Sequence, residues 1–343
     1  MKIEVYSPTI RRKEMDAVLT AMVEDKIGPG EQGKLLSQIA REKLKFDYCL
    51  PLRSPAMALH FALKALGIED GKAVAVSALS PRYYAQVLED LRLKPLYCDV
   101  LPSASFMGRE TIEKAIAAKP EGLDVRAVVL HHTLGYAPDT ASIAELGLPV
   151  IEDNSQSYGT VTAEVPAGST GVFTIMGLEE RDMLTAGSGA LLYAASRRDA
   201  SVLRNYAELA PEFGLPDMNA AMGVVQFRES AKNLEKRREI ARIYTQSALR
   251  TRHKRFVQGD NSEYNNYAFP LILETGMKDV KAYAKRKDIA VESAFDNTLI
   301  ALVPPEACQE AYSLSLRTAL FPLHPRLTAS EIEKVSKLIL TLP

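Results

Sequence analysis

The sequence has no excess of charge of either sign and no long apolar run. Lys and Arg together number 42 against 43 for Asp and Glu, which leaves a formal charge of −1. The totals therefore give no electrostatic case for binding nucleic acid or an anionic membrane. The opening residues MKIEVYSPTIRRKEMDAV lack the apolar core of a signal peptide, and no run approaches the roughly 20 apolar residues that a membrane span needs. We expect a cytoplasmic protein.

Cysteine is scarce, and the few potential metal ligands are badly spaced. Cys49, Cys98 and Cys308 are odd in number and form no CxxC motif, which favours buried or idle thiols in a reducing compartment. His131 and His132 are adjacent at the end of a predicted strand, where neighbouring side chains point to opposite faces. The pair cannot chelate one ion without distortion, so we expect no metal site.

Lysine is absent from the whole stretch between Lys119 and Lys232. This stretch contains the most unusual local pattern, GVFTIMGLEERDMLTAGSGAL at residues 171–191. An apolar strand runs into a charged loop, EERD, and a Gly-rich return leads into a second strand. Such a loop is a suitable place for a reactive side chain, but this loop contains no lysine amine.

The rest of the 343-residue chain alternates between short apolar strands and helices. Strands such as AVAVSAL, RAVVLHH and LPVIED alternate with helical segments, one of which begins after Ser54 with Pro55 as its first residue. This pattern predicts an α/β domain around a largely parallel sheet. A long amphipathic helix at 218–250 joins a large domain, 1–235, to a small α+β domain, 236–343.

Seven phrases resemble, in order, those of the DegT-type sugar aminotransferases, which belong to the fold-type-I pyridoxal-phosphate (PLP) enzymes. SPAMALHFALKALGI resembles SGTxALxxALxALGI, VIEDNSQSYG resembles VIEDAAQAHG, and FPLHPRLTASEIEKV resembles LPLHPxLTxxEIxxV. KPLYCDV, HHTLGYAPD, AAMGVVQFRE and KRREIARIY match four more. The resemblance implies an aspartate aminotransferase-like large domain with a mostly parallel sheet, a small α+β C-terminal domain, and a homodimer with sites between subunits.

The resemblance also assigns positions at the site. The family's lysine, which forms a Schiff base with PLP, falls on Asp182, or on Glu179 if residues are counted forward from Phe173. Asp153 matches the carboxylate that keeps the pyridine nitrogen protonated, and Gln156 matches the residue that contacts the ring hydroxyl. Asp153 could equally be a helix N-cap after a strand.

At the phosphate end the family's pattern is broken. Pro55-Ala56 stands where the family has Gly-Thr, which removes a backbone donor and a hydroxyl, although Thr174 can replace a serine. Glu212 and Gly214 stand where a partner subunit would lend Asn and Arg, and a carboxylate repels phosphate. The ring-stacking aromatic falls on Pro81, with Tyr83 or Tyr84 as substitutes. We expect a vestigial pocket of Asp153, Gln156, Thr174 and Ala56.

Three functional hypotheses follow. The first is a member of this family that lacks PLP chemistry and binds a nucleotide sugar or a protein partner such as an active paralogue. The second is a PLP- or pyridoxamine-phosphate (PMP)-dependent enzyme in which Asp182, Glu179 or Glu180 replaces the lysine as a base. The third is an unrelated activity in the same cleft. We expect no covalent cofactor, and a homodimer or a heterodimer with a paralogue.

Overall fold

The computed structural model describes residues 2–256 and 261–343. Its central element is a seven-stranded sheet in the order β1-β9-β8-β5-β4-β2-β3. The strands are β1 (Tyr48–Leu52), β2 (Ala73–Ser77), β3 (Lys94–Cys98), β4 (Val125–His131), β5 (Val150–Asp153), β8 (Phe173–Gly177) and β9 (Ala190–Ala194). Strands from β3 to β8 are parallel to their neighbours, whereas β9 runs antiparallel to both β8 and β1. The predicted α/β architecture with a mostly parallel sheet is confirmed.

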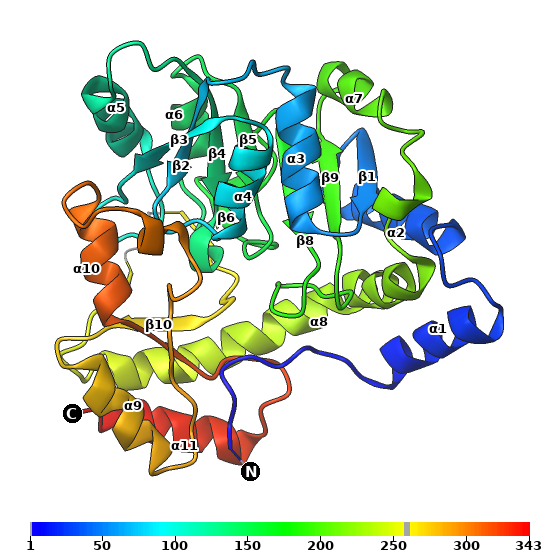
Figure 1. Ribbon diagram of the computed structural model, residues 1–343. Coiled ribbons are helices and arrows are strands. Elements are labelled where there is room, and N and C mark those ends of the chain that lie inside the picture. Colours follow the sequence, from blue (N-terminus) through cyan, green and yellow to red (C-terminus); the bar gives the residue numbers. More distant parts are fainter. Residues whose placement is uncertain (1, 257–260) are drawn as a thin grey trace.

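Helices cover both faces of this sheet (Figure 1). Successive strand residues point to opposite faces, so Val129 and Leu130 of β4 pack against different helices. Val129 packs with α3 (Pro55–Ala65), α4 (Tyr83–Asp90) and α7 (Arg197–Arg204). Leu130 packs with α5 (Arg109–Ala118) and α6 (Thr140–Ala144). On this second face α2 (Glu31–Leu44) and α8 (Asp217–Ala248) cover β8, β9 and β1. The sheet is therefore buried on both sides, as its continuous apolar strands predict.

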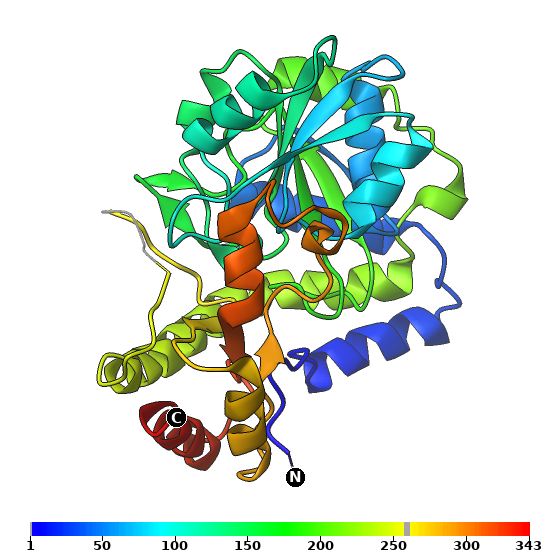
Figure 2. The same cartoon turned by 60° about the vertical axis from the view of Figure 1, so that its left-hand side comes forward.

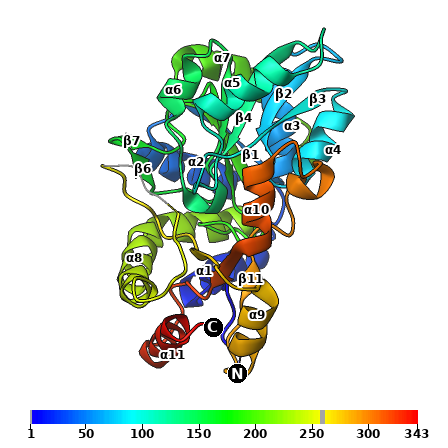
Figure 3. The ribbon, with the colours of Figure 1, turned by 90° about the vertical axis from the view of Figure 1, so that its left-hand side faces the viewer.

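The long helix α8 connects the sheet region with the C-terminal elements. Most of these lie below the sheet in Figure 1, and α10 (Gln309–Arg317) reaches up to the sheet region in Figure 3. These elements include a three-stranded sheet in the order β10-β12-β11. Its strands are β10 (Phe269–Ile272), β11 (Glu292–Ser293) and β12 (Thr318–Phe321), and the accompanying helices are α9 (Met277–Lys285), α10 (Gln309–Arg317) and α11 (Ala329–Leu340). This is the predicted mixture of strands and helices; the domain boundary at residue 235 stays a prediction.

The remaining elements are an N-terminal helix and short connections. Helix α1 (Arg12–Val23) packs along α8 at the edge of the molecule (Figure 2). The short elements are β6 (Val161–Thr162), β7 (Val165–Pro166) and the 3-10 helices η1 (Thr133–Gly135), η2 (Pro211–Phe213) and η3 (Leu299–Leu302). Over the residues that the structure describes, no helix combines the length and apolar character needed to cross a bilayer.

Candidate functional site

A cavity of about 540 Å³ lies at the carboxyl ends of the parallel strands, where ligands collect in open α/β sheets. From the sheet region it is lined by Pro81, His131 and Gln156, and by Arg181 and Asp182 of the loop between β8 and β9. Its opposite wall comes from the C-terminal elements: Lys281 of α9, Glu292 and Ser293 of β11, and the segment 294–298. The backbone amide of Arg82 donates to the Asn297 carbonyl (3.2 Å), which holds the two walls together.

Asp153, at the end of β5, is fully engaged by donors from its own chain. Its Oδ2 accepts hydrogen bonds from the hydroxyls of Tyr84 (2.7 Å) and Tyr83 (3.2 Å). Its Oδ1 accepts from the backbone amide of Ser155 (3.1 Å) and from the Ser155 hydroxyl. Burial, followed by the charge of Asp153, raises the pKa of both tyrosines well above the usual value, so both hydroxyls stay protonated and keep donating.

These contacts separate Asp153 from the cavity. The residue is 1% exposed, and the described residues that line the cavity do not include it. Tyr83 and Tyr84, which we expected as substitutes for the ring-stacking aromatic, use their hydroxyls on Asp153, and the Tyr84 ring also packs edge-on against His131 (ring centroids 6.3 Å apart). The carboxylate that would face a pyridine nitrogen is thus occupied by two phenols.

The other residues of the expected pocket are also bound internally. Gln156 borders the cavity, and its side-chain oxygen accepts the backbone amide of Leu134 (2.7 Å). The Thr174 hydroxyl is buried and donates to the Gly168 carbonyl (3.0 Å). Ser54 caps α3 by accepting the amide of Met57 (3.2 Å), and Pro55, the first residue of that helix, supplies no amide. Neither the start of α3 nor Thr174 lines the cavity.

The loop between β8 and β9 places a carboxyl group, Asp182, on the cavity wall. Its Oδ2 accepts the backbone amide of Glu179 (2.8 Å), and a Cβ on Gly177 would overlap both this oxygen and the Ser155 hydroxyl. Burial, followed by the nearby charges of Asp153 and Glu179, raises the pKa of Asp182 to about 8, although the Glu179 amide opposes the shift. At neutral pH Asp182 is therefore largely a neutral acid and can donate or accept a proton.

The two other carboxylates of the loop lie elsewhere. The Glu179 Oε1 accepts the Ser188 hydroxyl and the Gly189 amide, both at 3.3 Å, and so ties the loop to its return strand. Glu180 is exposed. Neither residue lines the cavity, so of the three acids considered as replacements for the lysine, only Asp182 contacts the cavity.

Charged side chains from both walls meet at the cavity. Arg181 donates to Glu292 (2.8 Å) and its guanidinium lies 5.0 Å from the centre of the Tyr6 ring. Lys281 donates from Nζ to the Ser293 hydroxyl (2.7 Å), a neutral partner. Sequence reasoning did not identify Lys281, Glu292 or Ser293, because none of the seven recognised phrases covers residues 277–298.

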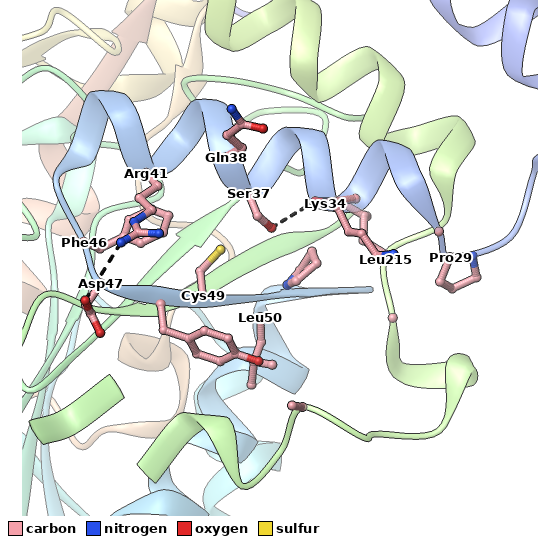
Figure 4. A pocket seen from close by; sticks show the side chains of 16 residues that line it. Pro29, Lys34, Ser37, Gln38, Arg41, Phe46, Asp47, Cys49, Leu50 and Leu215 are labelled. Atoms are coloured by element: carbon pink, nitrogen blue, oxygen red, sulfur yellow. Dashed lines mark hydrogen bonds and ion pairs between the residues drawn. The ribbon is translucent and has the colours of Figure 1, made fainter. Parts of the chain in front are cut away.

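Glu212 and Gly214 lie outside this cavity, on the segment before α8. Glu212 is exposed, and Gly214 pairs with Leu52 in a single antiparallel bridge. The same segment borders a second cavity of about 490 Å³ between α2 and β1 (Figure 4). There Lys34, Ser37, Gln38 and Arg41 come from α2, and Cys49 and Leu50 come from β1.

Sequence reasoning also missed a buried contact between His132 and Glu152 behind the site. His132 Nε2 lies 3.2 Å from Glu152 Oε2, and its Nδ1 lies 2.8 Å from the Ser157 hydroxyl. His131 belongs to a separate contact, with the Thr133 hydroxyl at 2.9 Å from its Nδ1. The sequence did offer a signal for this contact: Glu152 and Asp153 are adjacent acids in a buried strand. Because adjacent strand residues face opposite sides of the sheet, only one of the two can face the site, and the other needs a partner behind it.

PLP does not fit these residues in the arrangement that the resemblance implies. Its ring nitrogen needs a free carboxylate, but Asp153 already accepts four hydrogen bonds. Its aldehyde needs an amine, but the loop presents Asp182, and its phosphate needs amides and hydroxyls, but Pro55 and the bonded Thr174 supply neither. For Asp153 to face the ring nitrogen, as the resemblance implies, the hydroxyls of Tyr83 and Tyr84 would first have to leave it.

Comparisons with known proteins agree with this architecture. The profile of the DegT/DnrJ/EryC1/StrS aminotransferase family matches residues 8–340. GDP-perosamine synthase from Escherichia coli O157:H7 is 24% identical over 71% of this chain and 70% of its own length. The match to the L-glutamine:2-deoxy-scyllo-inosose aminotransferase of Streptomyces fradiae is 27% identical over 54% of this chain and 43% of that protein.

Solved structures show the same fold. The PLP form of Spr1654 from Streptococcus pneumoniae superposes with a TM-score of 0.89 at 16% identity, over 99% of this chain and 98% of that one. A DegT DnrJ EryC1 StrS aminotransferase from Brucella abortus gives a TM-score of 0.87 at 22% identity, over 95% and 94% of the two chains. The chain therefore belongs to the DegT/DnrJ/EryC1/StrS aminotransferase family.

Proposed function

We propose that this chain works by binding a ligand in the 540 Å³ cavity, without PLP chemistry. The observation that carries the proposal is the state of Asp153, which accepts four internal hydrogen bonds and does not line the cavity. The acidic residue at the lysine position and the lack of an amide at Pro55 support it. The fold persists, while the groups that would hold and activate the cofactor are engaged with one another.

The first prediction concerns the cofactor. Titration with PLP or PMP should show no binding tighter than about 1 mM, a free energy near −4 kcal/mol. After borohydride reduction with PLP, no adduct should lie between residues 120 and 231, because no lysine occurs there and arginine stays protonated. Peptide mapping separates this result from labelling of surface lysines. Micromolar binding, or an adduct at Lys281 on the cavity wall, would contradict the proposal.

The ligand class that we propose is a nucleotide sugar. The relatives include a GDP-perosamine synthase, and the cavity offers two cations, Arg181 and Lys281, beside the polar groups of Ser293 and Asn297. Arg181 is already paired with Glu292, whereas Lys281 donates its hydrogen bond to a neutral hydroxyl, that of Ser293. Lys281 is therefore the better placed of the two to bind a diphosphate.

The second prediction tests this ligand class by calorimetry with GDP-, dTDP- and UDP-hexoses. At least one should bind, and Lys281→Met should weaken its binding by about tenfold or more, the loss expected for one charge-assisted hydrogen bond. Lys278, exposed on the same helix, gives the matched control, and Lys278→Met should bind normally. If none of the panel binds, a protein partner, such as an active paralogue, becomes the preferred ligand.

A second candidate function rests on Asp182. A carboxyl group with a pKa near 8 that borders a cavity can act as a general acid or base at neutral pH. In a PLP- or PMP-dependent enzyme with Asp182 in place of the lysine, Asp182 would be this acid or base. Such an enzyme would also require Tyr83 and Tyr84 to release Asp153. Tight binding of PMP in the first experiment, lost in Asp182→Asn, would favour this function.

A further inference from the structure

A hollow of about 320 Å³ lies where the N-terminal segment that leads into α1 packs against α8 (Figure 1). One wall comes from residues between Thr9 and Glu14, and the other from residues of α8 between Gln226 and Lys236. Pro325, from the C-terminal elements, also borders it. No described residue lines both this hollow and either of the two cavities above, so it is a separate place on the molecule.

Positive charge gathers around this hollow, although the whole chain carries −1. Five cations and two carboxylates line it: Arg11, Arg12, Lys13, Lys232 and Lys236, with Glu14 and Glu229. Arg12 also contacts Asp16, outside the hollow, at 3.7 Å. Lys236 likewise pairs with Glu239 at 2.9 Å. Even with these two outer acids counted, the cations outnumber the carboxylates.

One carboxylate shows how the cations of the hollow hold an oxyanion. Glu229 accepts hydrogen bonds from Lys13 on its Oε1 (2.7 Å) and from Lys232 on its Oε2 (3.0 Å). These bonds, that of Lys13 first, lower the pKa of Glu229 to about 2, so it stays ionised at neutral pH. Each ammonium group has three N–H donors, so both lysines keep donors for a second anion.

Two further donors at the hollow have no partner among the described residues. Arg11 gives its backbone amide to Glu14 (2.9 Å), but no described carboxylate pairs with its guanidinium. Asn233 is only 7% exposed, and its Oδ1 accepts from Arg237 Nε (2.9 Å). Because a guanidinium has no acceptor, the Asn233 oxygen must face Arg237, which leaves its NH₂ group for the hollow. A buried amide normally has a partner, so this one indicates a ligand.

The donors and the size of the hollow favour a small phosphorylated molecule. A phosphate monoester carries up to two negative charges on three oxygens, and arginine binds phosphate through two parallel N–H donors. Lys232 and Lys236 lie one turn apart on the same face of α8, opposite the N-terminal cations, which suits more than one phosphate group. A volume of about 320 Å³ fits a small ligand, whereas a nucleic-acid strand follows an extended groove.

We propose that this hollow binds a small molecule with two or more phosphate groups, held by Arg11, Lys13, Lys232 and Lys236 and by the NH₂ group of Asn233. The site is distinct from the 540 Å³ cavity. The inference therefore goes beyond the proposed function, and either can fail without the other.

The third prediction uses inorganic tripolyphosphate as the probe, in calorimetry at low salt with the full chain. Wild type should bind it. Asn233→Asp should weaken binding by about tenfold or more, because aspartate keeps the oxygen that Arg237 contacts but replaces the NH₂ group with an anionic oxygen. Arg11→Gln should have an effect of similar size through the loss of a charge-assisted hydrogen bond. Arg242, exposed on α8 outside the hollow, gives the matched control, and Arg242→Gln should bind like wild type.

Two comparisons assign the binding to this hollow. Lys281→Met, which alters the other cavity, should bind tripolyphosphate like wild type, and circular dichroism should show that Asn233→Asp and Arg11→Gln remain folded. The proposal is overturned if wild type shows no binding tighter than about 1 mM, if both hollow variants bind normally, or if Lys281→Met abolishes binding. Tighter binding of citrate would contradict a phosphate ligand, and tighter binding of a single-stranded oligonucleotide would contradict a small one.

Discussion

The Glu152→Gln variant is expected to lose about 2–5 kcal/mol of its free energy of unfolding, because it takes a charged acceptor away from several buried hydrogen-bond donors. Glu152 is 1% exposed. Its Oε1 accepts the backbone amides of Thr170 (2.8 Å) and Gly171 (2.6 Å). Its Oε2 accepts the Gly168 amide (3.1 Å) and the Thr140 hydroxyl (3.2 Å), and contacts His132. A glutamine must turn its NH₂ group toward one of these two sets of donors.

The effect should depend on pH in a defined direction. Burial raises the pKa of Glu152, but the bonds from His132 and the backbone amides outweigh burial, so the pKa is lowered from its usual value of 4.5. A carboxylate with a lowered folded-state pKa stabilises the protein above the unfolded-state pKa, and that contribution is lost as the pH falls through the folded value. The difference between wild type and Glu152→Gln should thus be full at pH 7 and shrink below about pH 4.5.

Denaturant unfolding at pH 7 and at pH 4 measures both expectations. Glu121 lies exposed in the loop between α5 and β4, and Glu121→Gln is the matched control, expected to change stability by less than about 0.5 kcal/mol. A Glu152→Gln variant as stable as this control would show that the Glu152 carboxylate adds nothing to stability through the segment 168–171 that it binds.

The fold could be predicted from local patterns because each strand and helix has its own periodicity. The apolar runs that became β2, β4 and β5 are too short for helices, and alternation with helices requires parallel pairing. The helix predicted at 218–250 is observed as α8, Asp217–Ala248. The order of pairing was less accessible, since β1 joins the sheet by pairing antiparallel with β9, more than a hundred residues away in the sequence.

The site could be predicted only where one segment carries the signal. Asp153 and Asp182 were identified because the family resemblance assigns a role to each position, but their environment comes from distant residues. Tyr84 is 69 positions from Asp153, and Glu292 is 111 positions from Arg181. Tyr83 and Tyr84 were noticed as possible stacking rings, but the structure shows that their hydroxyls bind Asp153. No pattern in the sequence indicated that the tyrosines would engage Asp153.

Asp182→Asn is expected to make the protein more stable at alkaline pH, the opposite of the usual cost of removing a buried polar group. The pKa of Asp182 is raised from 3.8 to about 8. Between these values the folded state holds a proton that the unfolded state has released, so wild-type stability falls as the pH rises through this window. Asparagine keeps the oxygen that accepts the Glu179 amide (2.8 Å) and carries no charge at any pH.

The stability advantage of Asp182→Asn over wild type should therefore grow by about 1–3 kcal/mol between pH 5 and pH 8.5; solvent in the cavity keeps this growth below the full value of the pKa shift. Asp296, an exposed carboxylate on the same cavity, provides the comparison, and Asp296→Asn should show no such dependence. A stability difference for Asp182→Asn that stays constant from pH 5 to pH 8.5 would mean that Asp182 is already ionised at neutral pH. It could not then act as the proton donor of an enzyme that uses it in place of lysine, and the cavity would hold one more negative charge against a nucleotide sugar.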